Sequence, residues 1–304
     1  MDQNDGDQKS SRRPHRASLA ARVFFAVLAM LAGYWWLSPD IWSSIMELGE
    51  PERARSALRF FDELRPYPAR GSNQGAILNW AATLWTERGM HGAYCTVLIA
   101  NTAVFISAIL ATFLSPLAAS TVSRANAFGE TMPLASITLR LVWQLAYWGA
   151  RVILVVLRAI PEYLMVFFAV ALTGLNVWAA VLALAIHNAG VFGRLLSETI
   201  ENTPQAVPLA TRSLGVSRLQ VLTFAILPRV FGRIIILLFY RWELCVRDSV
   251  VVGMLGVSSL GLWVMDARAR DRYDEMLFFL VLSGVLVVFS EAVSLWVRSY
   301  FRRS

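Results

Sequence analysis

The sequence predicts an all-α integral membrane protein with about six transmembrane helices. Of its 304 residues, 57% are hydrophobic and 16% are charged, and the mean hydropathy is +0.53. A soluble domain is about 25% charged. Roughly 20 consecutive apolar residues are needed to cross a bilayer, and several runs of that length occur along the chain. This composition argues against an independent soluble enzyme.

The N-terminal region predicts one membrane anchor followed by an external loop. A polar cytoplasmic tail, residues 1–19, precedes an apolar anchor at residues 20–38. No A-x-A-like cleavage site occurs before the Trp35–Trp36 pair, so the run is interpreted as an anchor and not as a signal peptide. The tryptophans fit a headgroup belt. Residues 39–92 mix alternating charges with amphipathic stretches, which predicts an extracytoplasmic loop with interfacial helices.

Residues 93–298 form the expected membrane core, which begins with a second span at Ala93–Leu117. The next apolar tract, 137–174, is too long for one crossing. If its LRAIPE segment were a hairpin turn, the later arginine-containing loop and the C-terminal arginines would lie outside, against the positive-inside rule. The tract is therefore expected to be an internal amphipathic lead-in, kinked near Pro161, that feeds a third span at about Arg158–Leu175.

The same rule places both termini in the cytoplasm, including a short tail at residues 299–304. The loop over residues 194–229 is then cytoplasmic as well. The remaining spans are expected at about Val177–Val191, Val230–Gly253 and Met276–Val297.

The sequence lacks the residues that several kinds of functional site require. A phosphate-binding P-loop requires a lysine, and the only one is Lys9 in the polar tail. The patterns H-E-x-x-H and G-x-S-x-G are absent. Cys95 and Cys245 lie far apart in apolar stretches and are interpreted as buried hydrophobic residues. We therefore expect no enzymatic activity, no metal, no cofactor bound by this chain and no nucleic-acid partner.

The loop over residues 194–229 carries the most information. Asn202 or Thr203 can cap a turn opened by Pro204, and Gly215 can take the left-handed conformation that ends it. Ser217 then begins a capping-box pattern. The spacing then predicts one apolar helix face that ends at Pro228 and consists of Leu219, Leu222 and Ile226. Two short helices bent around a glycine predict either a rigid knob that transmits force or a simple interfacial connector.

This loop resembles the cytoplasmic loop of binding-protein-dependent ABC importer permeases, whose pattern is E-A-A, three residues, G, nine residues, I-x-L-P. The matching positions are Ala210, Gly215, Leu227 and Pro228. The sequence departs from the pattern at Leu209, Thr211 and Ala225, where the family has Glu, Ala and Ile. The resemblance implies an ATPase-coupling loop whose residues are Pro204, Leu209, Ala210, Gly215, Ser217, Leu219, Leu227 and Pro228.

From about Leu157 to the end, motifs such as RAIPE, A-x-H-N-A-G and Y-R-W-E-x-x-V-R are similar to phosphonate-importer permeases. The resemblance implies a MetI-like core, a permease homodimer in the bacterial inner membrane and an extracytoplasmic solute-binding protein. It also implies cytoplasmic ABC ATPase subunits that bind ATP and Mg. The expected cargo is phosphonate or a related phosphorus oxyanion, phosphite or phosphate, moved inward by alternating access.

Placing an ionisable residue inside a membrane span costs free energy, so such residues in the predicted spans indicate functional positions. The substrate-pathway candidates are Glu162, His187, Arg241, Glu243 and Arg247. Glu243 and Arg247 are four residues apart and can pair on one helix face, which leaves Arg241 to find Glu162, water or substrate. The competing interpretation is an interhelical salt bridge, and for His187 a hydrogen bond that only supports packing.

Three glycines follow the fifth predicted span, Gly253, Gly256 and Gly261. They allow close helix approach or a bend near an outer gate, and the alternative is an ordinary loop start. Two other function classes are kept beside the ABC permease. One is an ion-coupled secondary transporter with Glu162, His187 and Glu243 as relay groups. The other is a membrane scaffold that uses the 194–229 loop only for docking.

Overall fold

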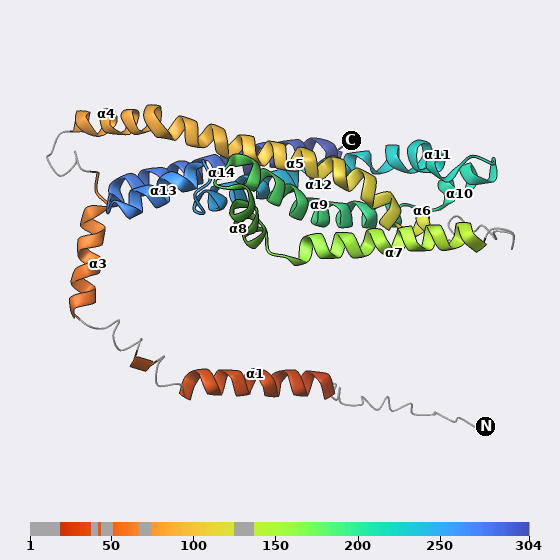
Figure 1. Cartoon of the computed structure of the whole chain (residues 1–304), viewed down its shortest axis with the longest axis horizontal. Helices are drawn as coiled ribbons and strands as arrows, with labels where there is room; N and C mark the ends of the chain where they lie inside the picture. The colour runs from red at the N-terminus through yellow and green to blue at the C-terminus, as the bar shows by residue number, and fades with distance from the viewer. Residues whose placement is uncertain (1–18, 38–41, 44–50, 67–73, 125–136, 304) are drawn as a thin grey trace, which may run out of the picture. The chain divides into compact units, whose positions relative to one another are not determined.

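The computed structural model describes residues 19–37, 42–43, 51–66, 74–124 and 137–303, and all the regular elements in these ranges are helices (Figure 1). The chain divides into two units, Met1–Asp62 and Glu63–Ser304. The first unit contains the apolar helix α1 (Leu19–Leu37) and all but the last residue of the amphipathic helix α3 (Pro51–Glu63). The polar tail expected over residues 1–19 lies almost entirely outside the described residues.

The second unit is a bundle of long helices. In Figure 1, α5, α9, α12 and α14 run beside one another, and these helices pack in pairs along the bundle. Its elements in chain order are α4 (Gln74–Leu84), a π-helical turn (Trp85–Gly89), α5 (Met90–Ala118), α6 (Ser120–Ser123), α7 (Ile137–Ala159), α8 (Glu162–Thr173), α9 (Val177–Glu201), α10 (Ala206–Ser213), α11 (Arg218–Gln220), a second π-helical turn (Val221–Ile226), α12 (Leu227–Gly253), α13 (Leu260–Ala269) and α14 (Tyr273–Arg303).

Five helices in the described part of the chain are long and apolar enough to cross a membrane. Many of their large apolar side chains are exposed, among them Phe105 at 67% and Phe289 at 64%, which is the expected arrangement when lipid is the solvent. In α1 the apolar stretch is shorter, Val23–Trp36, and the first predicted span, which falls on α1, stays a prediction. The five are Ala76–Ala118, Thr138–Ala159, Val177–Glu201, Arg218–Gly253 and Tyr273–Arg302.

The placement of the third span at Arg158–Leu175 is wrong. Helix α7 ends at Ala159, and Pro161 takes an extended ψ of 135° before α8 begins. A proline has no N–H and restricts the residue before it, so the helix is interrupted there. The 12 residues of α8 reach only about 18 Å, short of the roughly 30 Å hydrocarbon core. The segment predicted as a lead-in, α7, is itself the helix with the required length.

Small side chains let the helices of the core approach closely. The main cluster joins α5, α8, α9 and α12, and much of it is alanine, including Ala100, Ala103 and Ala180 at 0% exposure. Since lipid tails are as apolar as leucine, helices in a membrane associate through close packing and interhelical hydrogen bonds. Thr96 supplies two such bonds, because its carbonyl accepts from the Ser249 hydroxyl and its Oγ1 accepts from the Leu260 N–H.

Candidate functional site

The loop between α9 and α12 has the predicted helix–glycine–helix form. Helix α10 ends at Ser213, and Gly215 follows with φ +83°. Its N–H donates to the Arg212 carbonyl at 3.0 Å. A left-handed φ costs little for glycine and much more for residues with a Cβ. Gly215 is therefore the joint at which the chain turns out of α10.

Two local predictions for this loop are wrong. Asn202 and Thr203 close α9 and do not cap α10: the Asn202 N–H donates to Glu198 and the Thr203 hydroxyl donates to Thr199. Leu219 does not share a buried face with Leu222, because Leu219 is 68% exposed and Leu222 is 7% exposed. The π-helical turn Val221–Ile226 changes the residues per turn in between, which breaks a pattern counted at 3.6.

The capping box is present as predicted, and it leads into that turn. The Ser217 N–H donates to Gln220 Oε1 at 2.7 Å, and the Gln220 N–H donates to Ser217 Oγ at 3.3 Å. Pro228 lies at the start of α12, directly after the π-helical turn. Helical structure therefore passes through Pro228 instead of stopping there.

Polar contacts join both ends of the loop to other helices. At its start, Arg151 of α7 donates to Glu201 Oε1 at 2.5 Å, and the Ser120 N–H donates to the same oxygen at 2.6 Å. After the glycine, Arg218 is 8% exposed and donates to the carbonyl of Arg124 at 3.0 Å. Its guanidinium also lies 5.2 Å from the centre of the Trp143 ring. A movement of the loop must therefore displace α6 and α7 as well.

All eight predicted coupling residues, from Pro204 to Pro228, are exposed. Apolar side chains of the same loop are exposed beside them, most strongly Leu214 at 80% and Phe224 at 76%. The back of the loop is covered by Val221 and Ile226, which pack with Leu196 and Ile200 of α9. The loop is thus fixed from behind and offers an apolar outer surface.

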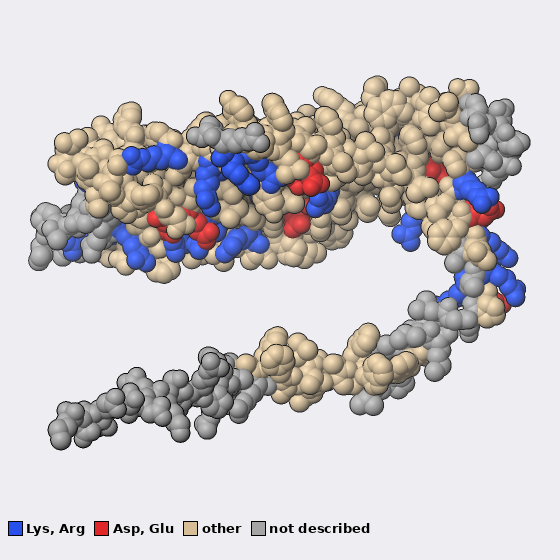
Figure 2. All heavy atoms as spheres, turned by 180° about the vertical axis from the view of Figure 1, so that it is seen from behind, with Lys and Arg blue, Asp and Glu red and all other residues tan. Residues whose placement is uncertain are grey.

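A charge cluster lies where α8, α9 and α12 meet. Arg241 donates to Asn188 Oδ1, and Asn188 is fully buried. The Nε of Arg241 is buried and has no hydrogen-bond partner among the described residues. Asp248, two turns along α12, interacts electrostatically with Arg241, Arg247 and Glu162. Figure 2 shows basic and acidic side chains beside one another on one face of the bundle, next to an uncharged stretch.

His187 bridges the break between α7 and α8. Its Nδ1 lies 3.1 Å from the Ile160 carbonyl oxygen, and its Nε2 lies 3.6 Å from Glu162 Oε2. Because a carbonyl only accepts hydrogen bonds, Nδ1 carries the hydrogen. The structure therefore brings together four of the five predicted pathway residues, Glu162, His187, Arg241 and Arg247.

Glu243, the fifth, faces elsewhere. The predicted Glu243–Arg247 pair is not among the ion pairs of the described residues, and Glu243 instead accepts from Arg298 of α14 at 2.8 Å. Arg247 is exposed, whereas Glu243 is 7% exposed. Spacing along one helix could not reveal a partner 55 residues away on another helix. Glu243 therefore joins α12 to α14 and is separate from Glu162 and His187.

The three predicted glycines form the tight connection between α12 and α13. A Cβ at Gly253 would collide with the Ser259 hydroxyl, and a Cβ at Gly261 would collide with the Val250 carbonyl. Gly256 has φ +97°. Two of the glycines thus allow backbones to touch, and the third allows the turn.

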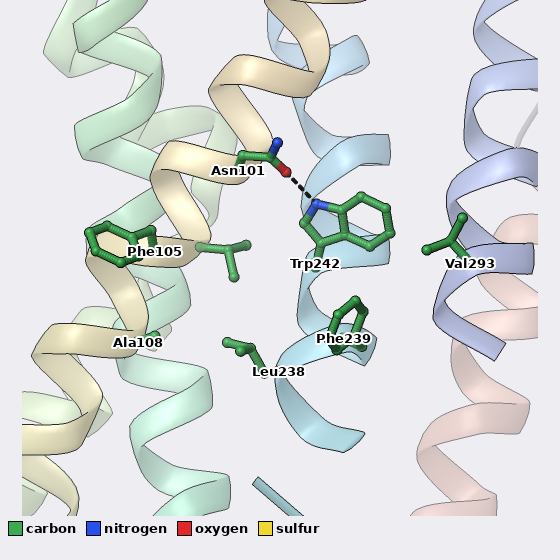
Figure 3. Close-up of a pocket in the computed structure, with 8 residues that line it drawn as sticks. Asn101, Phe105, Ala108, Leu238, Phe239, Trp242 and Val293 are labelled. Carbon is green, nitrogen blue, oxygen red and sulfur yellow. Dashed lines mark hydrogen bonds between the residues drawn. The ribbon is translucent and has the colours of Figure 1, made fainter. Parts of the chain in front are cut away.

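An apolar cavity of about 420 Å³ lies between α5, α12 and α14 (Figure 3). Asn101 and Trp242 supply its polar atoms, and they satisfy each other, since Trp242 Nε1 donates to Asn101 Oδ1 at 2.6 Å. Phe105 and Leu238 line the cavity as well. Burying a charged group beside such walls is costly. This cavity is unsuited to an oxyanion.

Residues 132–304 match the model of the family described as binding-protein-dependent transport system inner membrane component. The chain belongs to this family. It is accordingly a multi-pass bacterial inner-membrane protein.

Two relatives of this chain are named as permeases for phosphorus oxyanions. The phosphite transport system permease protein PtxC of Stutzerimonas stutzeri is 34% identical over 52% of this chain and 58% of its own. The phosphate-import permease protein PhnE of Mycolicibacterium smegmatis is 31% identical over 49% of this chain and 28% of its own. The chain thus spans little more than half of the first relative's length and about a quarter of the second's.

Solved permeases share the fold of the second unit. A chain of the inward-facing MetNI methionine ABC transporter has a TM-score of 0.57 and 18% identity, and covers 70% of this chain and 95% of that one. A chain of an amino acid ABC transporter solved with histidines has a TM-score of 0.55 and 18% identity, and covers 76% and 99%. The predicted MetI-like core is confirmed.

Several residues of this permease were missed as site residues by sequence reasoning. Glu201, Arg218 and Arg151 were not predicted as site residues and lie in otherwise ordinary helical segments. Asn188 entered the sequence analysis only as the asparagine of the motif A-x-H-N-A-G. The signal available in the sequence was the free-energy cost of burying a polar side chain. A buried arginine or amide in an apolar run needs a hydrogen-bonding partner, and that partner marks a junction between helices.

Proposed function

We propose that the chain is the transmembrane permease subunit of an ATP-driven ABC importer for phosphonate or a related phosphorus oxyanion, phosphite or phosphate. Two copies assemble around a pathway on their two-fold axis. Cytoplasmic ATPase subunits bind ATP and Mg, and an extracytoplasmic solute-binding protein delivers the cargo. The chain itself hydrolyses nothing.

The observation that carries this proposal is the construction of the loop between α9 and α12. Its apolar outer face, with Leu214 and Phe224, suits a protein partner. Through Glu201 the loop is tied to Ser120 of α6 and to Arg151 of α7, and through Arg218 it is tied to the Arg124 carbonyl directly after α6. When a nucleotide-driven partner moves the loop, these ties carry the movement to the spans.

The charge cluster supports an anionic cargo. Among the described residues, the Nε–H of Arg241 is buried without a hydrogen-bond partner, and Arg247, further along α12, is exposed. Glu162 and Asp248 partly offset these charges. A partly compensated pair of arginines lowers the barrier for a doubly charged head group without holding it tightly, which an importer requires because the cargo must leave again.

The test is reconstitution of the full chain with its ATPase and solute-binding partners in liposomes. We expect the binding protein loaded with phosphite, phosphate or methylphosphonate to stimulate ATP hydrolysis and to drive accumulation of at least one of these anions. Accumulation that follows an imposed proton or sodium gradient without ATP would overturn the proposal in favour of a secondary transporter. Failure of any ATPase to co-purify would also count against it.

A further inference from the structure

A second cavity, of about 710 Å³, lies between the first turns of α12 and the last turn of α14. We call it the basic cavity. It is lined by Arg229 and Arg233 of α12 and by Arg302 of α14. Figure 1 shows the end of α14 beside the start of α12. The basic cavity is distinct from the charge cluster, which lies further along α12 around Arg241.

Within the part of the chain that the structure describes, the three arginines form no ion pair with an acidic side chain. All three are exposed. The sequence contains no Asp or Glu between Leu227 and Trp242, and none after Glu291. Three positive charges therefore face one cavity, and no described acidic side chain pairs with them.

The other walls of the cavity are apolar. Phe231, Ile236 and Leu237 line it from α12, and Phe301 lines it from α14. A small soluble anion would be attracted by the arginines but would not cover the apolar walls. A molecule with both an anionic group and a hydrocarbon chain would use both parts of the cavity.

Aromatic side chains locate this end of the bundle at a membrane surface. Trp296 and Tyr300 on the last turns of α14 are 73% and 67% exposed, and Phe231 is 54% exposed. Tryptophan and tyrosine are enriched where hydrocarbon meets headgroups. The candidate spans that contain these residues are Arg218–Gly253 and Tyr273–Arg302, and both reach their ends here.

We propose that the basic cavity binds an anionic phospholipid, with the headgroup phosphate on Arg229, Arg233 and Arg302 and an acyl chain along Phe231 and Phe301. Basic pockets between transmembrane helices on the cytoplasmic side are suited to such headgroups. The lipid links the start of α12, which continues directly from the loop, to the end of α14. The proposal concerns lipid and does not depend on which cargo is carried.

The test uses the purified full chain in bilayers that contain spin-labelled phosphatidylglycerol or, separately, spin-labelled phosphatidylcholine. We expect a larger motionally restricted fraction with the anionic lipid, displaced by unlabelled phosphatidylglycerol. Each arginine removed, as in Arg233→Gln, lowers the preference by about fivefold. The matched control is Arg268→Gln on α13, an exposed arginine outside the basic cavity, which leaves the preference unchanged.

Three outcomes overturn the proposal. The first is equal restriction of the two lipids by the unsubstituted chain, a measurement that needs no variant to fold. The second is displacement of the labelled lipid by inorganic phosphate at matched ionic strength, which identifies a site for a soluble anion. The third is an unchanged lipid preference in Arg233→Gln together with loss of ATPase co-purification, which identifies a protein-docking surface. Because this experiment measures lipid binding, its outcome does not depend on whether the transport assay of the proposed function succeeds.

Discussion

Arg151 of α7 and Glu201, the last residue of α9, lie 2.5 Å apart, guanidinium nitrogen to carboxylate oxygen. The same arginine donates through Nε to the Ala118 carbonyl at 3.0 Å, and the same carboxylate oxygen accepts the Ser120 N–H. The ends of α5 and α9 thus meet on one side chain of α7, directly before the loop. This junction holds the starting point of the loop.

Glu201→Ala should lower the midpoint of thermal unfolding and weaken coupling. The substitution removes an acceptor shared by a guanidinium and a backbone N–H, and hydrogen bonds to charged groups contribute about 1.5–3 kcal/mol each. Both side chains are partly exposed, at 25% and 19%, so we expect the lower part of that range. Glu201→Gln keeps an acceptor and should lose less. Equal unfolding midpoints for the two variants would contradict the role of the junction.

Gly215→Val should lower binding-protein-stimulated ATP hydrolysis while the chain still inserts into the membrane. Nothing lies within 4 Å of a Cβ at this position, so the cost is backbone strain of about 1–2 kcal/mol at a left-handed φ. Gly284 in α14 also has open space around its Cβ position, without a positive φ. Gly284→Val is therefore the control and should keep full stimulation.

Breaking the Glu243–Arg298 pair should destabilise the packing of α12 on α14. The two side chains are only 9% and 18% exposed, and leaving one buried charge unpaired costs about 3–5 kcal/mol. Glu243→Gln should therefore unfold in detergent at a clearly lower temperature. The exchange Glu243→Arg with Arg298→Glu should recover part of the loss. No recovery in the double variant would argue that each charge acts alone.

Arg241→Ala should reduce transport more than assembly. Within the described part of the chain its Nε has no hydrogen-bond partner and its Nη2 donates to Asn188 Oδ1, so the substitution removes few hydrogen bonds. We expect at least a tenfold fall in the rate of anion uptake by liposomes, about 1.4 kcal/mol, with normal recovery of the ATPase complex. Equal losses of complex and uptake would instead favour a packing role for Arg241.

Gly261→Ala should disturb the connection between α12 and α13, because the added methyl group would meet the Val250 carbonyl. A cost of about 1–3 kcal/mol is usual for overpacking. Gly149→Ala in α7 has free space and should be neutral or slightly stabilising, since alanine is the better helix former. Thermal unfolding of the two variants in parallel decides the point.

Hydropathy was sufficient to find most of the long helices. Runs predicted at Val177–Val191, Val230–Gly253 and Met276–Val297 appear as α9, α12 and α14, each longer than its apolar centre. An apolar run of about twenty residues is recognised even when a few of its positions are misjudged. The region around Pro161 was misread because a proline between two apolar runs does not say which run is the longer helix.

Contacts between distant residues were the part that sequence could not supply. The capping box at Ser217 and the joint at Gly215 depend on neighbours in the chain, and both were predicted correctly. The partners of Glu243 and Arg218 depend on which helices pack, and helical spacing suggested Arg247 for the first and nothing for the second. The π-helical turn before Pro228 was also invisible, because patterns are counted with an assumed pitch.

The unequal lengths of the spans bear on bilayer thickness. Ala76–Ala118 has 43 residues and Thr138–Ala159 has 22, which correspond to about 65 Å and 33 Å. The first can slide through a thicker or thinner bilayer, whereas the second barely matches a hydrocarbon layer of roughly 30 Å. Hydrophobic mismatch therefore acts first on α7, the helix that carries Arg151. Lipids with longer acyl chains should lower the rate of transport because they strain that helix.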